Sequence, residues 1–203
     1  PDKLLFSRQT FVFTFATTNL NNNLKQITTF EIDVRSDQVM PLATNSIAIP
    51  LNNRSISVGD FTGEGLNEIL STDSRSTVFL LESKLGIDKT IWTYPFKIGK
   101  GFIVQVLAVN ADNDDALEIV VVSENSISII YDLDDIAVEL ISTDDTIRFA
   151  QIADTNRDGI LDIAYLLTSN NPDNDERLVV RSLTTTSTEI ISIPTNGVKE
   201  IAF

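Results

Sequence analysis

The residues best suited to chemistry in this chain form a short acidic segment, residues 154–162, with the sequence Asp-Thr-Asn-Arg-Asp-Gly-Ile-Leu-Asp. Oxygen-bearing side chains occupy its positions 1, 3, 5 and 9, which are Asp154, Asn156, Asp158 and Asp162. Gly159 stands at position 6, where a tight loop turns sharply, and the backbone carbonyl of Ile160 at position 7 offers a further oxygen. Because Ca²⁺ takes six to eight oxygen ligands, this pattern predicts a calcium-binding loop.

Two earlier segments repeat this pattern of oxygen-bearing residues. At residues 60–68 the predicted metal ligands are Asp60, Thr62, Glu64, the Leu66 carbonyl and Glu68. At residues 110–118 they are Asn110, Asp112, Asp114, the Ala116 carbonyl and Glu118. Both copies depart from the third, because Glu64 and Asn110 replace aspartates and Asp115 replaces the glycine at position 6. Asp tolerates left-handed backbone better than most residues. The third loop therefore matches the motif best. For all three loops the alternative interpretation is a turn rich in Asp, Asn and Gly that binds no metal.

The residues that position these loops read as strands. An EF-hand places its last ligand at position 12 and has helical flanks. Here the last acid stands at position 9, and apolar runs at residues 147–153 and 163–167 flank the loop. Such runs, rich in β-branched and aromatic residues, favour strands. The loops begin at residues 60, 110 and 154, and spacings of 50 and 44 residues are typical of solenoids, propellers or arrays.

From residue 55 onward one unit recurs: strand, acidic loop, strand, short turn, strand, longer turn, strand. The predicted strands are 55–59, 68–72, 76–82 and 90–97, then 102–109, 118–123, 126–132 and 136–142, then 147–153, 162–168, 177–183 and 187–193. No window has a sustained 3.6-residue apolar period, so no long helix is expected. Four antiparallel strands in a unit of roughly 45–50 residues are typical of propeller blades.

The first 49 residues are less regular. Residues 3–7, 10–16 and 26–34 are expected to form strands, and residues 41–50 a linker or a weak edge strand, because Pro41 cannot donate to a ladder. The units are expected at residues 1–52, 53–99, 100–144 and 145–196, with residues 197–203 starting the next. The expected fold is therefore an all-β propeller segment of about four blades.

The charge and the residue composition exclude or disfavour several classes of function. The net charge is −14, which disfavours nucleic acid and anionic membrane surfaces because phosphates are repelled. Ten of the 29 acidic residues lie in the three loops, so part of this charge suits cation binding. Without His or Cys, the usual nucleophilic triads and Cys/His zinc sites are excluded. No apolar run approaches the roughly 20 residues that cross a bilayer. Because the sequence opens with Pro1 and shows no signal peptide, we expect a processed, trimmed or partial chain.

Residues 58–69 and 152–164 resemble the FG-GAP (VCBS-type) repeat. That family includes the integrin α-chain head and many secreted or surface propellers. The resemblance covers about residues 55–203 and implies a seven-bladed ring with Ca²⁺ in the loop between the first two strands of a blade. It also implies an extracellular or cell-surface protein, with an intracellular or organelle-lumen scaffold as the alternative.

The leading functional hypothesis is therefore a calcium-binding interaction or adhesion module with protein partners. A carbohydrate-binding propeller is the alternative, for which Trp92 and Tyr94 in residues 92–96 are the candidate contacts. Core packing is the other interpretation of that aromatic cluster. A propeller-based polysaccharide lyase or hydrolase is a third hypothesis, and the absence of His together with dispersed acids leads us to expect no enzyme.

The ends of the chain stand at corresponding points of the repeat. Residues 201–203 align with the strand that enters an acidic loop, and residues 1–5 align with the exit from one. We expect the edge of residues 198–203 to be open, or covered by another chain or a missing segment. Pairing of residues 198–203 with residues 3–7 would instead close a four-bladed ring.

Overall fold

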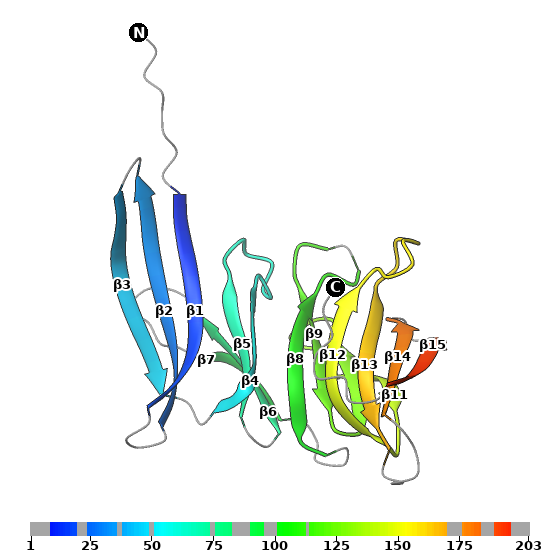
Figure 1. Cartoon of the computed structure of the whole chain (residues 1–203). Coiled ribbons are helices and arrows are strands. Elements are labelled where there is room, and N and C mark those ends of the chain that lie inside the picture. The colour runs from blue at the N-terminus through cyan, green and yellow to red at the C-terminus, as the bar shows by residue number, and fades with distance from the viewer. Residues whose placement is uncertain are drawn as a thin grey trace.

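A computed structural model of the chain describes residues 9–19, 24–35, 38–48, 51–73, 76–82, 90–95, 101–112, 114–169, 176–183 and 189–195. These residues form fifteen strands in four antiparallel sheets, and none of them is helical (Figure 1). In this described part of the chain there is no helix that is long and apolar enough to cross a membrane. The all-β class and the antiparallel sheets predicted from the sequence are thus confirmed.

Each sheet is built from strands that follow one another in the chain. The first sheet contains β1 (Gln9–Asn19), β2 (Leu24–Arg35) and β3 (Gln38–Ala48). The second contains β4 (Leu51–Gly59), β5 (Glu68–Asp73), β6 (Thr77–Glu82) and β7 (Thr90–Pro95). The third contains β8 (Ile103–Val109), β9 (Glu118–Ser123), β10 (Ser126–Ile130) and β11 (Val138–Ser142). The fourth contains β12 (Thr146–Ala153), β13 (Asp162–Thr168), β14 (Glu176–Ser182) and β15 (Glu189–Thr195).

The predicted strands of the three repeated units lie within a few residues of these bounds, except that β4 begins at Leu51 and not at residue 55. The linker expected from residue 41 is wrong, because residues 38–48 form an eleven-residue strand. The alternative, an edge strand, is confirmed: β3 pairs only with β2. Pro41 stands opposite Ile32, where the register shifts, so its missing N–H is tolerated. The strand expected at residues 3–7 lies outside the described residues.

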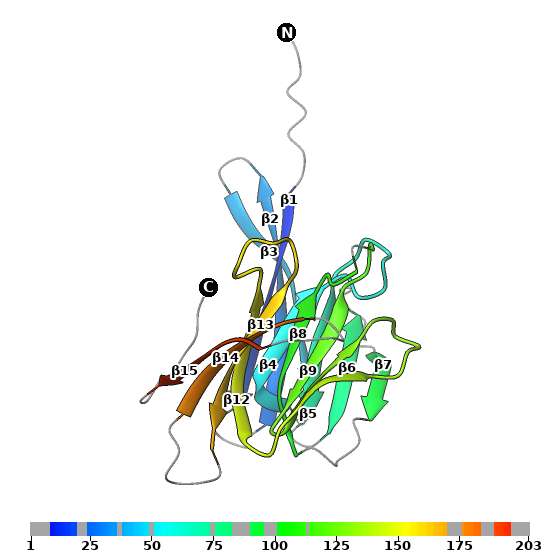
Figure 2. The ribbon, with the colours of Figure 1, turned by 90° about the vertical axis from the view of Figure 1, so that its right-hand side faces the viewer.

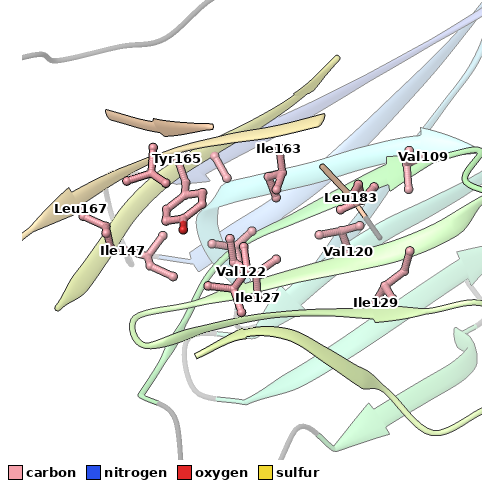
Figure 3. Packing of buried hydrophobic residues seen from close by; sticks show 13 residues of the cluster. Val109, Val120, Val122, Ile127, Ile129, Ile147, Ile163, Tyr165, Leu167 and Leu183 are labelled. Atoms are coloured by element: carbon pink, nitrogen blue, oxygen red, sulfur yellow. The ribbon is translucent and has the colours of Figure 1, made fainter. Parts of the chain in front are cut away.

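The two central strands of the third sheet, β9 and β10, are buried on both faces, and β9 has an unbroken apolar run at residues 119–122. Ile119 and Val121 point into a cluster shared with the second sheet. Val120 and Val122 point the other way, into a cluster shared with the fourth sheet. Figure 3 shows this second cluster, in which Tyr165 of β13 faces side chains of β9 and β10. Strands covered on both faces read as continuous hydrophobic runs, and alternation is lost.

The first strands of the last three sheets lie side by side, with β4 against β8 and β8 against β12 (Figure 1). Side chains bridge these strands where no sheet ladder joins them. Ser55 Oγ donates to Val106 O at 2.9 Å and also accepts from Val106 N. Gln105 Oε1 accepts from Ala150 N at 3.1 Å. Because these bridges hold the three strands alongside one another, the loops that follow them emerge at one end of the molecule.

Hydrogen-bonded strand pairing stays within each of the four sheets in the described residues. Residues 198–203, whose edge was expected to be open, and residues 3–7 both lie outside the described ranges. The closure of a ring is therefore left as a prediction.

Candidate metal centres

All three acidic loops join the first strand of a sheet to its second strand. They connect β4 to β5, β8 to β9 and β12 to β13, and they lie at the same end of the molecule (Figures 1 and 2). In each loop the acid at position 9 is also the first residue of the next strand. These acids, Glu68, Glu118 and Asp162, are 5%, 1% and 0% exposed. Burial of a carboxylate is costly unless it is hydrogen-bonded or paired, so their partners decide the character of each loop.

One contact is common to the three loops: the buried acid at position 9 accepts the backbone N–H of position 2. Phe61 N donates to Glu68 Oε2 at 2.8 Å. Thr155 N donates to Asp162 Oδ2 at 3.0 Å. Ala111 N donates to Glu118 Oε2. The strand that leaves the loop therefore holds the residues that enter it, which fixes the loop's width.

The third loop is closed by its own hydrogen bonds. Asp154 accepts Asp158 N on Oδ1 at 3.2 Å and Gly159 N on Oδ2 at 3.0 Å. Asn156 Oδ1 accepts Asp158 N at 2.9 Å, and Asp158 Oδ1 accepts Ile160 N at 2.8 Å. The predicted ligands Asp154, Asn156 and Asp158 thus surround one short stretch of backbone. The N–H groups of Asp158, Gly159 and Ile160 thus donate to carboxylate or amide oxygens.

Asp162, the buried acid of the third loop, has donors on both oxygens. Oδ2 accepts from Thr155 N and, at 2.5 Å, from Thr155 Oγ1. Oδ1 accepts from Ser182 Oγ at 3.4 Å. Sequence reasoning missed both hydroxyls. Thr155 lies next to the predicted ligands Asp154 and Asn156, so the sequence could have suggested it. Ser182 belongs to the neighbouring strand β14, and nothing in the sequence indicates that it lies near Asp162.

The first loop has hydrogen bonds like those of the third. Asp60 accepts Glu64 N on Oδ1 at 3.2 Å and Gly65 N on Oδ2 at 2.6 Å. Thr62 Oγ1 donates to Glu68 Oε1 at 3.4 Å. Burial raises the pKa of Glu68, and the nearby charge of Asp60 adds to the increase. Thr62, which the sequence placed as a neutral ligand, here serves as a hydrogen-bond donor to the buried acid.

The first and third loops also share a backbone path. Position 4 is left-handed in both, with φ of 70° at Gly63 and 64° at Arg157. Position 6 is left-handed as well, with φ of 78° at Gly65 and 84° at Gly159. The second loop differs, because Asp115 at position 6 is not left-handed. The idea that Asp115 stands in for the glycine conformation is therefore wrong, and this loop must turn in another way.

The second loop holds the tightest group of carboxylates in the described part of the chain. Oxygens of Asp112, Asp114 and Glu118 lie within 4.8 Å of one another. At position 1, where the other two loops have aspartate, Asn110 Nδ2 donates to Asp114 O at 2.9 Å. Asp114 Oδ1 accepts Ala116 N at 2.8 Å. Three carboxylates of this loop are therefore close enough to bind one cation.

Within the described part of the chain, one oxygen of Glu118 has no hydrogen-bond partner. Its Oε2 accepts from Ala111 N, but the buried Oε1 has no hydrogen-bond partner. Burial raises the pKa of Glu118, and the charges of Asp112 and Asp114 raise it further. A cation at this point would supply the charge that no donor provides. The donor set, three carboxylates and a backbone carbonyl, suits a hard cation.

The sequence ranked the third loop first as a metal site, and the structure brings three carboxylates closest together in the second. Leu66 and Ile160, chosen for their carbonyls, have side chains that are about half exposed, at 48% and 45%. Glu64 is exposed at the tip of the first loop, and its backbone N–H is held by Asp60. The residue types at positions 1, 3, 5, 7 and 9 therefore do not show which of the three loops most needs a cation.

The aromatic cluster on β7 is tied to the next sheet. The rings of Trp92 and Tyr94 stack with centroids 5.7 Å apart. Trp92 Nε1 donates to Leu133 O at 2.7 Å, and Tyr94 Oη accepts from Ala137 N at 3.1 Å. Both rings pack against the cluster between the second and third sheets. Their apolar faces and their polar atoms thus join two sheets.

Comparison with known proteins adds no identification. No family model matches the chain, and no curated protein matches it significantly. The FG-GAP resemblance therefore rests on residues 58–69 and 152–164 alone.

Proposed function

We propose that this protein is a calcium-binding β-propeller segment of the FG-GAP type that serves as a non-catalytic interaction module for protein partners. The cations are structural: each neutralises carboxylates that the fold gathers at the entrance to a strand. Binding energy then becomes folding energy, because the unfolded chain has no preformed site.

One observation carries the calcium assignment. Glu118 Oε1 is buried without a hydrogen-bond donor, beside the carboxylates of Asp112 and Asp114. An uncompensated buried charge is expensive, and proteins usually pair it or coordinate it to a metal. Ca²⁺ fits because all the candidate ligands are oxygens and because the chain has no His or Cys for softer metals.

The arrangement of the sheets supports the propeller. Three successive four-stranded sheets each begin with a strand that lies beside the equivalent strand of its neighbour. Each carries its acidic loop between its first two strands. Propeller blades have this internal order, with the first strand nearest the axis. A ring of seven such blades, completed by further segments, is the arrangement we propose.

The proposed partners and location rest on the family resemblance. An extracellular or surface setting suits weak calcium sites, since extracellular modules bind Ca²⁺ with dissociation constants of about 10⁻⁴–10⁻³ M. The glycan-binding alternative has less support. Trp92 and Tyr94 direct polar atoms to Leu133 and Ala137, so these atoms are engaged within the protein.

Calorimetric titration with Ca²⁺ tests the assignment. The wild-type protein should bind Ca²⁺, and Glu118→Gln should lose one site because an amide is a weaker, neutral ligand. Asp115→Asn is the matched control: it removes the same charge from an exposed residue of the same loop and should keep the site. Identical isotherms for the wild type and Glu118→Gln would refute the site in the second loop.

A further inference from the structure

The first and second acidic loops are in direct contact through their backbones. Leu117 N donates to Asp60 O at 2.8 Å. Asp60 is position 1 of the first loop, and Leu117 is position 8 of the second. Leu117 lies between Ala116, whose carbonyl is a candidate ligand, and Glu118, the buried acid. A change in the path of residues 116–118 therefore moves the donor that holds Asp60.

Side chains reinforce this contact. The Leu117 side chain fills the space beside Gly59, where a Cβ would overlap Leu117 Cδ1 and come within 3.8 Å of Phe61 Cε2. Phe61 is 3% exposed, and Leu117 packs against the same apolar cluster. Ala116 reaches Gly63, where an added Cβ would lie 3.7 Å from Ala116 Cβ. Residues on both sides of Asp60 thus rest on the last turn of the second loop.

The third loop makes its equivalent contact elsewhere. Leu161 is its position 8, and Leu161 O accepts from Leu183 N at 2.7 Å at the end of β14. Its side chain packs against the cluster between the third and fourth sheets. The Leu161 backbone is therefore hydrogen-bonded to its own sheet, whereas the Leu117 backbone is hydrogen-bonded to the first loop.

We infer that cation binding in the second loop sets the conformation of the first, with Leu117 as the positioning residue between them. The inference rests on the proposed calcium site at Asp112, Asp114 and Glu118. In the absence of a cation these carboxylates repel one another, and this repulsion opposes the contacts that Leu117 makes with Asp60 and with the cluster that contains Phe61. A bound cation holds the segment, and the Leu117 N–H and side chain then hold Asp60 and Phe61.

The consequence for the first loop follows from its hydrogen bonds. The Asp60 carboxylate accepts the N–H groups of Glu64 and Gly65. When the backbone of Asp60 is held in place, the orientation of its carboxylate toward these two N–H groups is held as well. The amides of Glu64 and Gly65 therefore report on the first loop, and the amides of Ala111 and Ala116 report on the second. Coupled sites typically alter each other's equilibria by a factor of about 5–150.

The experiment is a Ca²⁺ titration of the whole chain followed by nuclear magnetic resonance, with amide exchange measured at these four residues. In the wild type the Glu64 and Gly65 amides should become protected over the same Ca²⁺ range as those of Ala111 and Ala116. In Glu118→Gln, protection of Glu64 and Gly65 should vanish or require at least about fivefold more Ca²⁺. The same protection curve in Glu118→Gln as in the wild type would overturn the coupling.

Two leucine variants test whether Leu117 couples the second loop to the first. Leu117→Ala should leave the Ca²⁺ response of Ala111 in place but shift the Glu64 and Gly65 response by at least about fivefold. Leu161→Ala removes the residue at the same position of the third loop, where the side chain packs against the same cluster as Ala111, and should leave the two midpoints together. A purely structural role for Leu117 would lower overall stability without separating the two midpoints, and that result would overturn the assigned role.

Failure of the calcium site itself has a different signature. If Ala111 and Ala116 do not respond to Ca²⁺ in the wild type, the proposed site and the coupling both fall. If they respond while Glu64 and Gly65 follow independently of Glu118→Gln, only the coupling falls.

Discussion

The second and third acidic loops have the same length and the same place in their sheets, but they satisfy their carboxylates differently. In the third loop both oxygens of Asp162 have donors, from Thr155 and Ser182. In the second loop Glu118 Oε2 accepts from Ala111 N, and Oε1 has no hydrogen-bond partner among the described residues. In the third loop, which has the better motif, the fold already supplies hydrogen-bond donors to the buried carboxylate. In the second loop, which has the weaker motif, the described residues supply no donor to one buried carboxylate oxygen.

This difference teaches that a ligand pattern and a need for metal are separate properties. The pattern counts oxygens along the chain, and residues 154–162 have more of the expected ones. The need for a cation depends on how many of those oxygens already accept hydrogen bonds in the fold. An unmet buried charge costs more than an exposed one, so Glu118 and not Asp162 should govern the response to Ca²⁺.

The largest effect is expected at Asp162 in the absence of metal. Asp162→Ala leaves the partly buried N–H of Thr155 and two hydroxyls without their charged acceptor, and the loss of these three hydrogen bonds should lower the free energy of unfolding by about 3–5 kcal/mol. Asp158→Ala, at an exposed position of the same loop, should cost about 1 kcal/mol or less. Urea denaturation in excess chelator measures both. Equal losses for the two variants would show that the Asp162 hydrogen bonds contribute little.

The response to Ca²⁺ should come chiefly from the second loop. A ligand at 100 times its dissociation constant stabilises the folded state by about 2.7 kcal/mol per site. Glu118→Gln should remove most of this gain, while its stability without metal should match or exceed that of wild type because the buried charge is gone. Thermal melts with Ca²⁺ and with chelator measure both quantities. A variant that responds to Ca²⁺ as strongly as wild type would move the site away from Glu118.

The third prediction concerns pH. The pKa of Glu118 in the folded protein is raised by burial and by Asp112 and Asp114. The folded state thus binds its proton more tightly than the unfolded state, so this group contributes most to stability at low pH and less as the pH rises through its folded pKa. The stability gain from Glu118→Gln in chelator should therefore be largest near neutral pH and shrink as the pH falls.

Comparing the two proteins at each pH cancels the titration of the other carboxylates. The gain from Ca²⁺ in the wild type should shrink over the same range, because a protonated carboxyl is a poor ligand. A pH-independent difference between wild type and Glu118→Gln would mean that the charge of Glu118 carries no penalty.

The smallest effect is expected at Arg157, which has left-handed backbone where the first loop has Gly63. Left-handed conformation costs a residue with a Cβ about 1–2 kcal/mol, and glycine returns part of this gain through its flexible unfolded state. Arg157→Gly should stabilise the protein by about 0.5–1 kcal/mol. Arg157→Ala, which keeps the Cβ, should give no such gain. Equal stabilities for the two variants would point to the Arg side chain and not to the backbone.

The sequence by itself predicted the strands of the three repeated units between residues 55 and 193, to within a few residues, and the three acidic loops. Apolar runs separated by turn residues predicted the strands of the second, third and fourth sheets, because burial of apolar residues and turn chemistry are local properties. The oxygen pattern placed all three acidic loops between first and second strands. An edge strand was one of the two alternatives predicted for residues 41–50, because Pro41 fits an edge, and the structure has it at residues 38–48.

The tertiary structure alone decided which loop lacks a partner and which loops touch. Ser182 reaches Asp162 from β14, and Leu117 holds Asp60 from a loop that is about fifty residues away in the sequence. Arg157 adopts left-handed backbone although its residue type does not favour it. A motif records what each residue can donate or accept. The balance of donors, acceptors and buried charge is set by the neighbours that the fold brings together, so only the folded chain shows where a cation is needed.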